Sequence, residues 1–340
     1  MERSPHKSET LLHVSDLKVH FRLRGKHPFA APSFVHAVDG VSFEIPKGST
    51  FGLVGESGCG KTTTALAIMR LIPVTAGRVM MRDMDITALT GDELRLARRH
   101  MQIIFQDPYS SLNPRTRARK IVSEPLRLMK IIQPSQHDER VAELFRYVGL
   151  RPEQQYLFPH QFSGGQRQRI VIARALGSQP DLIVCDEPVS ALDVAIQAQI
   201  LNLLRRLQRE FGLTYLFISH DMGVIQHMCD EIAVMYLGAI VEQAGWGDFF
   251  KHPMHPYTLA LLSGVPSADP KVKSMAGRIN LEGDPPNPLD IPEGCRFASR
   301  CPFTKEMCRT EMPVLKQVEE NHRVACHLIS DIDSAKSLWK

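Results

Sequence analysis

The sequence contains no apolar run that approaches the ~18 residues needed to span a bilayer, and its first residues lack the apolar centre of a signal peptide. Excess charge is also scarce, because 41 Lys and Arg residues face 37 Asp and Glu residues, for a formal net charge of +4. This balance does not indicate nucleic-acid binding. No internal repeat is present. The 340 residues, 43% of them hydrophobic, suffice for one large α/β domain and a smaller appendage.

The chain does contain a glycine-rich segment that matches the phosphate-loop (Walker A) pattern in full: Gly55-Glu56-Ser57-Gly58-Cys59-Gly60-Lys61-Thr62. The flanks also fit, since the pattern predicts a short buried strand over 50–54 and a helix that opens with Thr62 and Thr63. Glycines let backbone N–H groups converge on phosphate oxygens at a helix N-terminus. We therefore predict a nucleoside triphosphate site, with Lys61 on the β and γ phosphates and the Thr62 hydroxyl on Mg²⁺.

A second candidate feature is the apolar run over 181–185, which ends in Asp186 and Glu187. This pattern is typical of a buried parallel strand whose carboxyl end faces a ligand. Phosphoryl transfer depends mainly on orienting water and neutralising charge, so we predict that Asp186 holds the Mg²⁺ hydration shell and Glu187 polarises the attacking water. Another apolar strand, over 214–218, leads to His220. We predict that His220 contacts the γ phosphate and orients Glu187, the alternative being a structural histidine.

These motifs resemble those of the ATP-binding-cassette (ABC) ATPases over about residues 11–250. Six of them occur in the family's order: the phosphate loop, Gln106, Ser163-Gly164-Gly165-Gln166, Asp186-Glu187, residues 190–193 and His220. The resemblance implies an α/β P-loop NTPase fold of the ABC type, with a mixed sheet core. It also implies a helical subdomain over about 107–178 that docks on a membrane-embedded permease. Residues 1–10 are predicted to be a polar tail.

The resemblance further implies how the ATP site is completed. Two ABC subunits pair head to tail, and residues Ser163, Gly164, Gly165 and Gln166 of one subunit would reach the ATP held by the other. Gln106 would ligate Mg²⁺ or water and sense the γ phosphate, and Phe21 would stack on adenine. Ser163 also fits a simple helix N-cap, a role that can coexist with the first. Phe21 has a core position as its alternative.

After about residue 250 the sequence is rich in proline and contains four of the seven cysteines: Cys295, Cys301, Cys308 and Cys326. Their spacing, Cys-x5-Cys-x6-Cys-x17-Cys, matches neither the Cys-x2-Cys pairs of zinc ribbons nor the ferredoxin runs. With His255-Pro256-Tyr257-Thr258 before them, these cysteines resemble the C-terminal domain of oligopeptide and dipeptide importer ATPases. That resemblance implies a loop-rich metal-binding extension over 251–340 with a [4Fe–4S] cluster on the four cysteines. Zn²⁺, free thiols and disulfides remain alternatives. Disulfides are the least favoured of these, because the cytosol keeps thiols reduced.

Together the resemblances imply the ATPase subunit of a peptide importer, with ATP and Mg²⁺ as cofactors, bound peripherally at the cytoplasmic face of the inner membrane. Its partners would be a second ABC ATPase subunit, two permease subunits and an extracytoplasmic solute-binding protein. The resemblance favours a non-identical ATPase partner, and the sequence leaves an identical one open. Nucleic acid is not among the partners, and the membrane is reached through the permeases. Three alternatives remain: another solute such as a nickel chelate, a soluble ABC ATPase without a transport role, and a redox sensor that gates transport. The sequence does not specify the solute, because other subunits select it.

Overall fold

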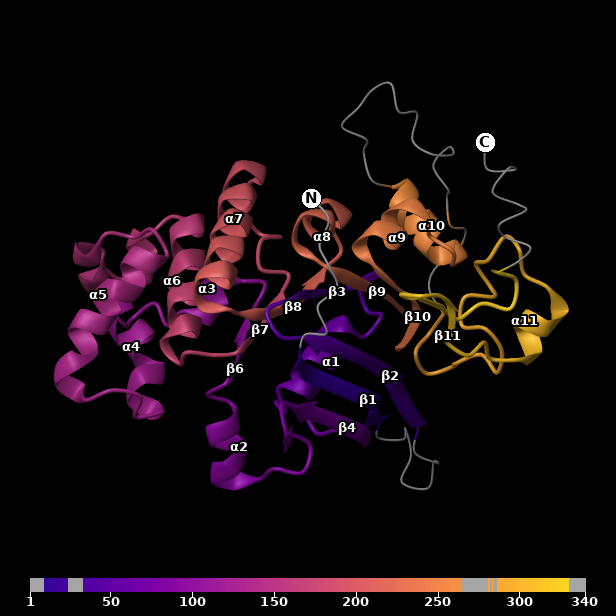
Figure 1. Ribbon diagram of the computed structural model, residues 1–340, viewed down its shortest axis with the longest axis horizontal. Helices are drawn as coiled ribbons and strands as arrows, with labels where there is room; N and C mark the ends of the chain where they lie inside the picture. The colour runs from indigo at the N-terminus through magenta and orange to yellow at the C-terminus, as the bar shows by residue number, and fades with distance from the viewer. Residues whose placement is uncertain (1–8, 24–32, 265–280, 282, 284–285, 330–340) are drawn as a thin grey trace. The chain divides into compact units, whose positions relative to one another are not determined.

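The computed structural model (Figure 1) describes residues 9–23, 33–264, 281, 283 and 286–329. These residues fall into two compact units. The first unit contains the residues up to His13, Glu44–Thr50 and Met80–Ile218. The second contains Val14–Phe43, Phe51–Val79 and the residues from Ser219 onward. The predicted polar tail over 1–10 lies outside the described residues except for its last two positions.

The first unit is built on three parallel strands in the order β8-β7-β6. Their bounds are β6 (Met101–Ile104), β7 (Leu182–Asp186) and β8 (Thr214–Ser219). All five residues of β7 are buried, as expected of a parallel strand that is covered on both faces. Ile104 pairs with Cys185, and Asp186 pairs with Ile218, so the carboxyl ends of the three strands lie side by side.

Helices and short helical turns make up most of the rest of the first unit. They are α2 (Gly91–Ala97), α3 (Pro108–Ser111), α4 (Ala118–Leu128), η1 (Pro134–Gln136), α5 (His137–Tyr147), η2 (Pro152–Tyr156), η3 (Pro159–Gln161), α6 (Gly164–Gly177) and α7 (Val194–Phe211). Helices α4, α5 and α6 pack on one another, and α3 packs on α6 (magenta in Figure 1). These four helices occupy the range predicted for a helical subdomain; its docking on a permease stays a prediction.

The second unit contains strands in the order β11-β12-β10-β9-β3. Their bounds are β3 (Thr50–Val54), β9 (Glu231–Tyr236), β10 (Ala239–Gly245), β11 (Lys316–Glu319) and β12 (His322–Val324). Strand β3 runs parallel to β9, whereas β10 is antiparallel to both β9 and β12. Two strands from the C-terminal extension therefore widen the sheet that contains β3, the strand before the phosphate loop.

A further sheet has the order β2-β1-β4-β5, with β1 (Thr10–Leu23), β2 (Ser33–Pro46), β4 (Ala76–Met81) and β5 (Met84–Asp85). Among the described residues of the second unit, the helices are α1 (Lys61–Ile68), α8 (Met222–Met228), α9 (Trp246–Lys251), α10 (Pro256–Ser263) and α11 (Glu306–Thr310). Stacked rings of Phe43 and Phe51, with centroids 4.6 Å apart, join β2 to β3 in its core. In the described part of the chain, the helices are all too short or too polar to cross a bilayer.

Candidate functional site

The phosphate-loop residues form the turn between β3 and α1 in the second unit. Strand β3 covers Thr50–Val54, which confirms the predicted strand, and α1 begins at Lys61. Gly60 has a φ of 107°, and a Cβ there would lie 2.2 Å from the carbonyl oxygen of Ala37. Only glycine fits at such a close approach. The loop thus has the strand, the tight turn and the helix start that phosphate binding requires.

The Lys61 ammonium lies inside this loop. Its Nζ donates hydrogen bonds to the carbonyl oxygens of Gly55 and Glu56, each at 2.8 Å, and the residue is 6% exposed. Cys59 is also buried there, and burial raises the pKa of its thiol. A protonated, buried thiol is a packing group, which disfavours a redox role for Cys59.

Three predicted site residues come together at the carboxyl edge of the parallel strands of the first unit. Gln106 follows β6, Asp186 ends β7 and Glu187 comes next. Asp186 is 5% exposed, Glu187 is half-buried and Gln106 is exposed. Carboxylate oxygens at this edge are suitable ligands for Mg²⁺ and its water, as predicted from the sequence.

Glu187 is held in an unusual backbone conformation. Its φ is 49°, in the left-handed region that costs a non-glycine residue about 1–3 kcal/mol. Hydrogen bonds fix it on both sides, because its N–H donates to the Ile218 carbonyl at 3.0 Å and its own carbonyl accepts from Ser190. Six other described non-glycine residues also have a positive φ, so the strain by itself assigns no role to Glu187. No local sequence signal could have revealed it.

His220 and Phe21 belong to the second unit. His220 directly follows β8 and is exposed, while the next residue, Asp221, caps α8 by accepting the Gly223 N–H at 2.8 Å. Phe21, near the end of β1, is 40% exposed. A core role for Phe21 is therefore excluded, which leaves its ring available for stacking. The contacts of Phe21 with adenine and of His220 with phosphate stay predictions.

Ser163 caps α6, as one of its two expected roles requires. Its hydroxyl accepts the Gln166 N–H at 3.3 Å, and the Gln166 side chain accepts the Ser163 N–H at 3.0 Å. This reciprocal capping box satisfies two backbone donors at the helix start. Gly165 is also sterically required, since a Cβ there would lie 2.6 Å from Ile196 Cγ2. The contact of Ser163, Gly164, Gly165 and Gln166 with a second subunit's ATP stays a prediction.

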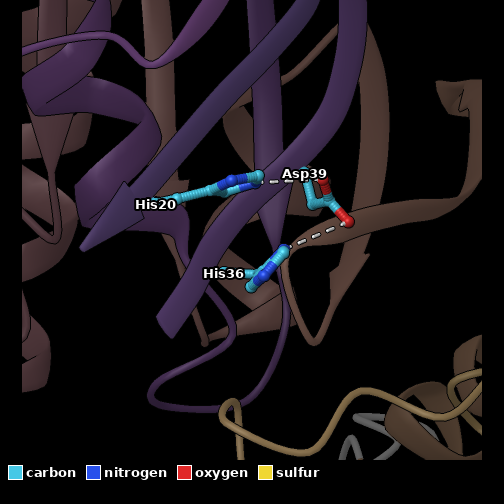
Figure 2. Close-up of side chains that lie close together, drawn as sticks. All are labelled: His20, His36 and Asp39. Carbon is cyan, nitrogen blue, oxygen red and sulfur yellow. Dashed lines mark hydrogen bonds and ion pairs between the residues drawn. The ribbon is translucent and has the colours of Figure 1, made fainter. Parts of the chain in front are cut away.

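Sequence reasoning missed a cluster of His20, His36 and Asp39, which Figure 2 shows together. His20 Nε2 lies 3.1 Å from Asp39 Oδ1, His36 Nδ1 lies 3.9 Å from Oδ2, and the two imidazole rings are 3.9 Å apart. His20 lies on β1, whereas His36 and Asp39 lie three residues apart on β2, so no local motif marks the three as a set. The guanidinium of Arg296 also binds Asp39, at 2.5 Å. Because Asp39 is already paired with a cation, we interpret the cluster as an ion-pair network and not as a metal centre.

The four C-terminal cysteines lie in one loop-rich part of the second unit. Cys308 is buried with Ala298 and Leu328, and Cys295 and Cys326 pack against this small core. Cys295 is preceded by Gly294, where a Cβ would lie 2.4 Å from the Cys308 carbonyl oxygen, so glycine is needed for the close crossing of these two segments. All seven cysteines are free thiols, which excludes the disulfide alternative in this structure.

Backbone amides point at three of these sulfurs. The amides of Phe297 and Phe303 hydrogen-bond Cys295 and Cys301, and Leu328 donates to Cys326 Sγ at 3.4 Å. Burial nevertheless raises the pKa of Cys301 to about 11 and that of Cys326 to about 12. A metal that binds here must therefore displace thiol protons.

No three of the four cysteine sulfurs lie within 4.8 Å of one another. In the described part of the chain, three or more potential metal-ligand atoms gather within 4.8 Å of one another only at His20, His36 and Asp39. This group includes no cysteine. Four thiolates on one tetrahedral Zn²⁺, each about 2.3 Å from the metal, would be only about 4 Å apart. The cysteine geometry is thus wider than a single zinc ion requires.

His255 caps α10 and places the start of that helix. Its Nδ1 accepts the Tyr257 N–H at 3.1 Å, and its own N–H donates to the buried Glu242 carboxylate at 2.9 Å. Glu242 also binds the Met254 N–H and His322 Nε2. The family-like segment His255 to Thr258 therefore has a structural purpose, which is to fix α10 against β10.

We expect His255→Asn to flatten the dependence of stability on pH. Burial lowers the pKa of His255 from 6.5 to about 4, although nearby Glu242 opposes the shift. Below pH 6.5 the unfolded chain therefore binds the proton first, and the folded state loses roughly 3 kcal/mol as the pH falls toward 4. Asparagine keeps a capping oxygen but does not titrate. Thermal unfolding at about pH 7.5 and 5 measures the difference. An equal loss in the variant would contradict this account. So would the same flattening in the control His252→Asn, because His252 is an exposed histidine.

Glu56 was predicted to bind nucleotide, but its polar groups contact protein. Its N–H donates to the Tyr257 hydroxyl at 2.8 Å, and its carboxylate binds the Arg300 guanidinium. Sequence reasoning missed both partners, although Tyr257 lies in the His255 to Thr258 segment and Arg300 adjoins Cys301.

Known proteins share both parts of the chain. Residues 38–190 match the ABC transporter family, and residues 241–308 match the family "Oligopeptide/dipeptide transporter, C-terminal region". The chain is 47% identical over 323 residues to the oligopeptide transport ATP-binding protein AppF of Bacillus subtilis, across 95% of this chain and 98% of that protein. The chain belongs to the ABC transporter ATP-binding proteins. It is thus an ABC ATPase.

Two further relatives place this ABC ATPase in the same group. It is 47% identical to the putative oligopeptide transport protein YkfD of Bacillus subtilis, over 96% of this chain and 98% of that one. It is 46% identical to the probable peptide transporter protein y4tS of Sinorhizobium fredii, over 94% and 90%.

Solved structures confirm the ABC-type fold of the ATPase. The cassette MJ0796, in a dimeric post-hydrolysis state with ADP and Pi, has a TM-score of 0.61 and 27% identity, and the match covers 69% of this chain and 98% of that one. The fold is also shared with cbiO1 of Clostridium perfringens, at a TM-score of 0.62 and 24% identity over 72% and 92% of the chains.

Proposed function

We propose that this ABC ATPase powers the import of oligopeptides or dipeptides as the ATP-hydrolysing subunit of a transporter. The observation that carries the proposal is the similarity to AppF, an oligopeptide transport protein, along nearly the whole chain. The match of residues 241–308 to an oligopeptide/dipeptide transporter region supports the same substrate class. A nickel chelate is the alternative solute, and none of the site residues favours it.

The roles of the site residues follow from their chemistry. Lys61 supplies a positive charge and Thr62 a hydroxyl at the start of α1, where backbone N–H groups attract phosphate. Bound Mg²⁺ neutralises phosphate charge; Thr62, Asp186 and Gln106 would hold it and its water. Glu187 orients the attacking water and accepts its proton.

We further propose that two such ATPases pair head to tail. Ser163, Gly164, Gly165 and Gln166 of one subunit would then complete the ATP site of the other, His220 would contact the γ phosphate, and Phe21 would stack on adenine. The exposed position of Ser163 at the start of α6 and the exposed ring of Phe21 support these roles. The likeness to MJ0796, whose structure is dimeric, supports the pairing.

The remaining partners are two permeases, a second and non-identical ATPase, and an extracytoplasmic solute-binding protein. ATP binding closes the ATPase pair and hydrolysis reopens it, and helices α3 to α6 would carry this movement to the permeases. The ATPase would therefore lie peripherally on the cytoplasmic face of the inner membrane.

We propose that Cys295, Cys301, Cys308 and Cys326 bind a [4Fe–4S] cluster. Four free thiols, three of them with backbone amides directed at sulfur, fit the chemistry of such a ligand set. The cluster would tie the loops of the extension together where little apolar core is available.

We expect Cys326→Ser to lose most of this cluster. Cys326 follows β12, and replacing its sulfur removes one of four ligands without disturbing the β10–β12 pairing. Iron, acid-labile sulfide and zinc are measured after anaerobic purification. Wild type should contain about four irons per chain, and the control Cys185→Ser, in the fully buried strand β7, should match it. Stoichiometric zinc in the wild type would refute the cluster.

Transport is tested with the complete complex in proteoliposomes. Peptide should accumulate only when ATP, the permeases and the binding protein are all present. If a nickel chelate stimulates ATP hydrolysis by the complex and peptides do not, the peptide assignment would be rejected. If the ATPase hydrolyses ATP but no permease or binding protein co-purifies with it from cells, the result would favour a soluble ABC ATPase without a transport role.

A further inference from the structure

Two arginines of the cysteine-containing segment bind the phosphate loop and its supports, all within the second unit. Arg300, which precedes Cys301, donates from Nη1 to Glu56 Oε2 at 2.8 Å and from Nη2 to Glu56 Oε1 at 3.1 Å. Such two-point arginine–carboxylate pairs are strong and geometrically specific. The Arg300 side chain is only 6% exposed and that of Glu56 29%, so solvent screens the pair incompletely.

A separate contact holds the backbone of Glu56. Its N–H donates to the hydroxyl of Tyr257 at 2.8 Å, and Tyr257 is fully buried. The Tyr257 ring packs against Tyr236, with centroids 4.7 Å apart, and against Phe297, at 5.4 Å. Phe297 comes from the same segment as Arg300. The stretch from Phe297 to Arg300 thus supplies both the charge that binds the Glu56 carboxylate and the ring that packs against Tyr257, whose hydroxyl accepts the Glu56 N–H.

The second arginine supports the far side of the loop. Arg296 follows Cys295 and donates to the Leu237 carbonyl and to Asp39. The residue after Leu237, Gly238, donates its N–H to the Cys59 carbonyl in the phosphate loop at 2.9 Å. The C-terminal segment therefore contacts the loop directly at Glu56 and, through the Leu237–Gly238 turn, at Cys59.

Charge explains why Glu56 needs a partner. Its carboxylate belongs to the loop that receives the anionic triphosphate, and like charges repel more strongly where water is partly excluded. Arg300 cancels that charge and draws the side chain toward the cysteine segment. Without it, Glu56 would oppose the ligand that the rest of the loop attracts.

We propose that Arg300 is a positioning residue for ATP: it neutralises Glu56 and fixes the phosphate loop in the shape that accepts phosphate. This inference rests on the proposed function, in which the loop binds ATP. It makes the cysteine-containing extension part of the nucleotide site's support. Arg300 itself touches none of the reacting atoms.

The test compares full-length variants for binding of the non-hydrolysable analogue AMP-PNP with Mg²⁺. Arg300→Ala should raise Kd about tenfold, because an unpaired carboxylate remains in the loop. The KM for ATP should rise by a similar factor, with kcat nearly unchanged. Arg300→Lys keeps the positive charge but loses the two-point geometry, so its Kd should lie between that of the wild type and that of Arg300→Ala. Arg309→Ala removes an exposed arginine of the same segment and should bind as wild type does.

A double variant distinguishes loss of charge neutralisation at Glu56 from a general structural effect of removing Arg300. If Arg300 acts through Glu56, adding Glu56→Gln to Arg300→Ala should restore much of the affinity, since the repelling charge is gone. A purely structural role for Arg300 predicts no such rescue. Should Arg300→Ala fail to fold, Arg300→Lys with and without Glu56→Gln makes the same comparison.

Two results would overturn the inference. Unchanged AMP-PNP binding in Arg300→Ala, or weak binding that Glu56→Gln does not relieve, would reject the positioning role while leaving the ATP site intact. No AMP-PNP binding by the wild type would instead overturn the proposed function, and this inference with it.

Discussion

Glu187→Gln is expected to slow ATP hydrolysis by about 100-fold or more, because a positioned general base contributes roughly 10²–10⁴ to such a rate. Glutamine keeps the size of glutamate and one hydrogen-bonding oxygen, but it cannot accept the proton of the attacking water. The backbone at this position is fixed by hydrogen bonds to Ile218 and from Ser190, so the substitution should leave the local fold intact. ATP binding should therefore persist, and the ATPase pair should accumulate in its ATP-bound form.

Steady-state ATPase assays, with size-exclusion chromatography in ATP, measure both effects. Glu210→Gln is the matched control, since Glu210 is an exposed residue of α7 whose partner is Arg206 in the same helix. It should hydrolyse ATP at the wild-type rate. Wild-type turnover by Glu187→Gln would remove Glu187 from the reaction.

Lys61→Ala should weaken ATP binding by about 100-fold and reduce hydrolysis in proportion, since a charge-assisted contact to phosphate is lost. The structural reason is twofold. The buried ammonium supplies the positive charge of the loop, and its hydrogen bonds to the Gly55 and Glu56 carbonyls brace the loop backbone. Alanine removes both.

Titration with AMP-PNP measures this loss. The control is Lys47→Ala, which removes an exposed lysine just before β3 and should not alter affinity. If Lys61→Ala binds AMP-PNP with near-wild-type affinity, the nucleotide does not bind at this loop.

The ATPase core was predictable where the sequence has continuous apolar runs. The strands expected over 50–54 and 214–218 correspond to β3 and β8, because buried parallel strands need apolar side chains on both faces. The short strand β11 gave no such signal, since all four of its residues are exposed. Its pairing with β12, and that of β12 with β10, depends on contacts made far along the chain.

The site was predictable as a set of motifs but not as a set of contacts. Glycine, lysine and carboxylate spacing indicated which residues bind ATP, whereas the partners of Glu56 lie 201 and 244 residues away. No local periodicity encodes such pairs. The positive φ of Glu187 was equally hidden, because the strain depends on the neighbouring strand β8. Likewise, the sequence suggested a metal role for the four cysteines but not the arginines between them.

ATP turnover by this subunit is proposed to drive peptide import. The most direct measurement is peptide uptake by proteoliposomes that contain the complete transporter, assembled with either wild-type or Glu187→Gln subunit. We predict ATP-dependent accumulation with the wild type and at most a small fraction of it with the variant. Equal peptide uptake by the two complexes would contradict the claim.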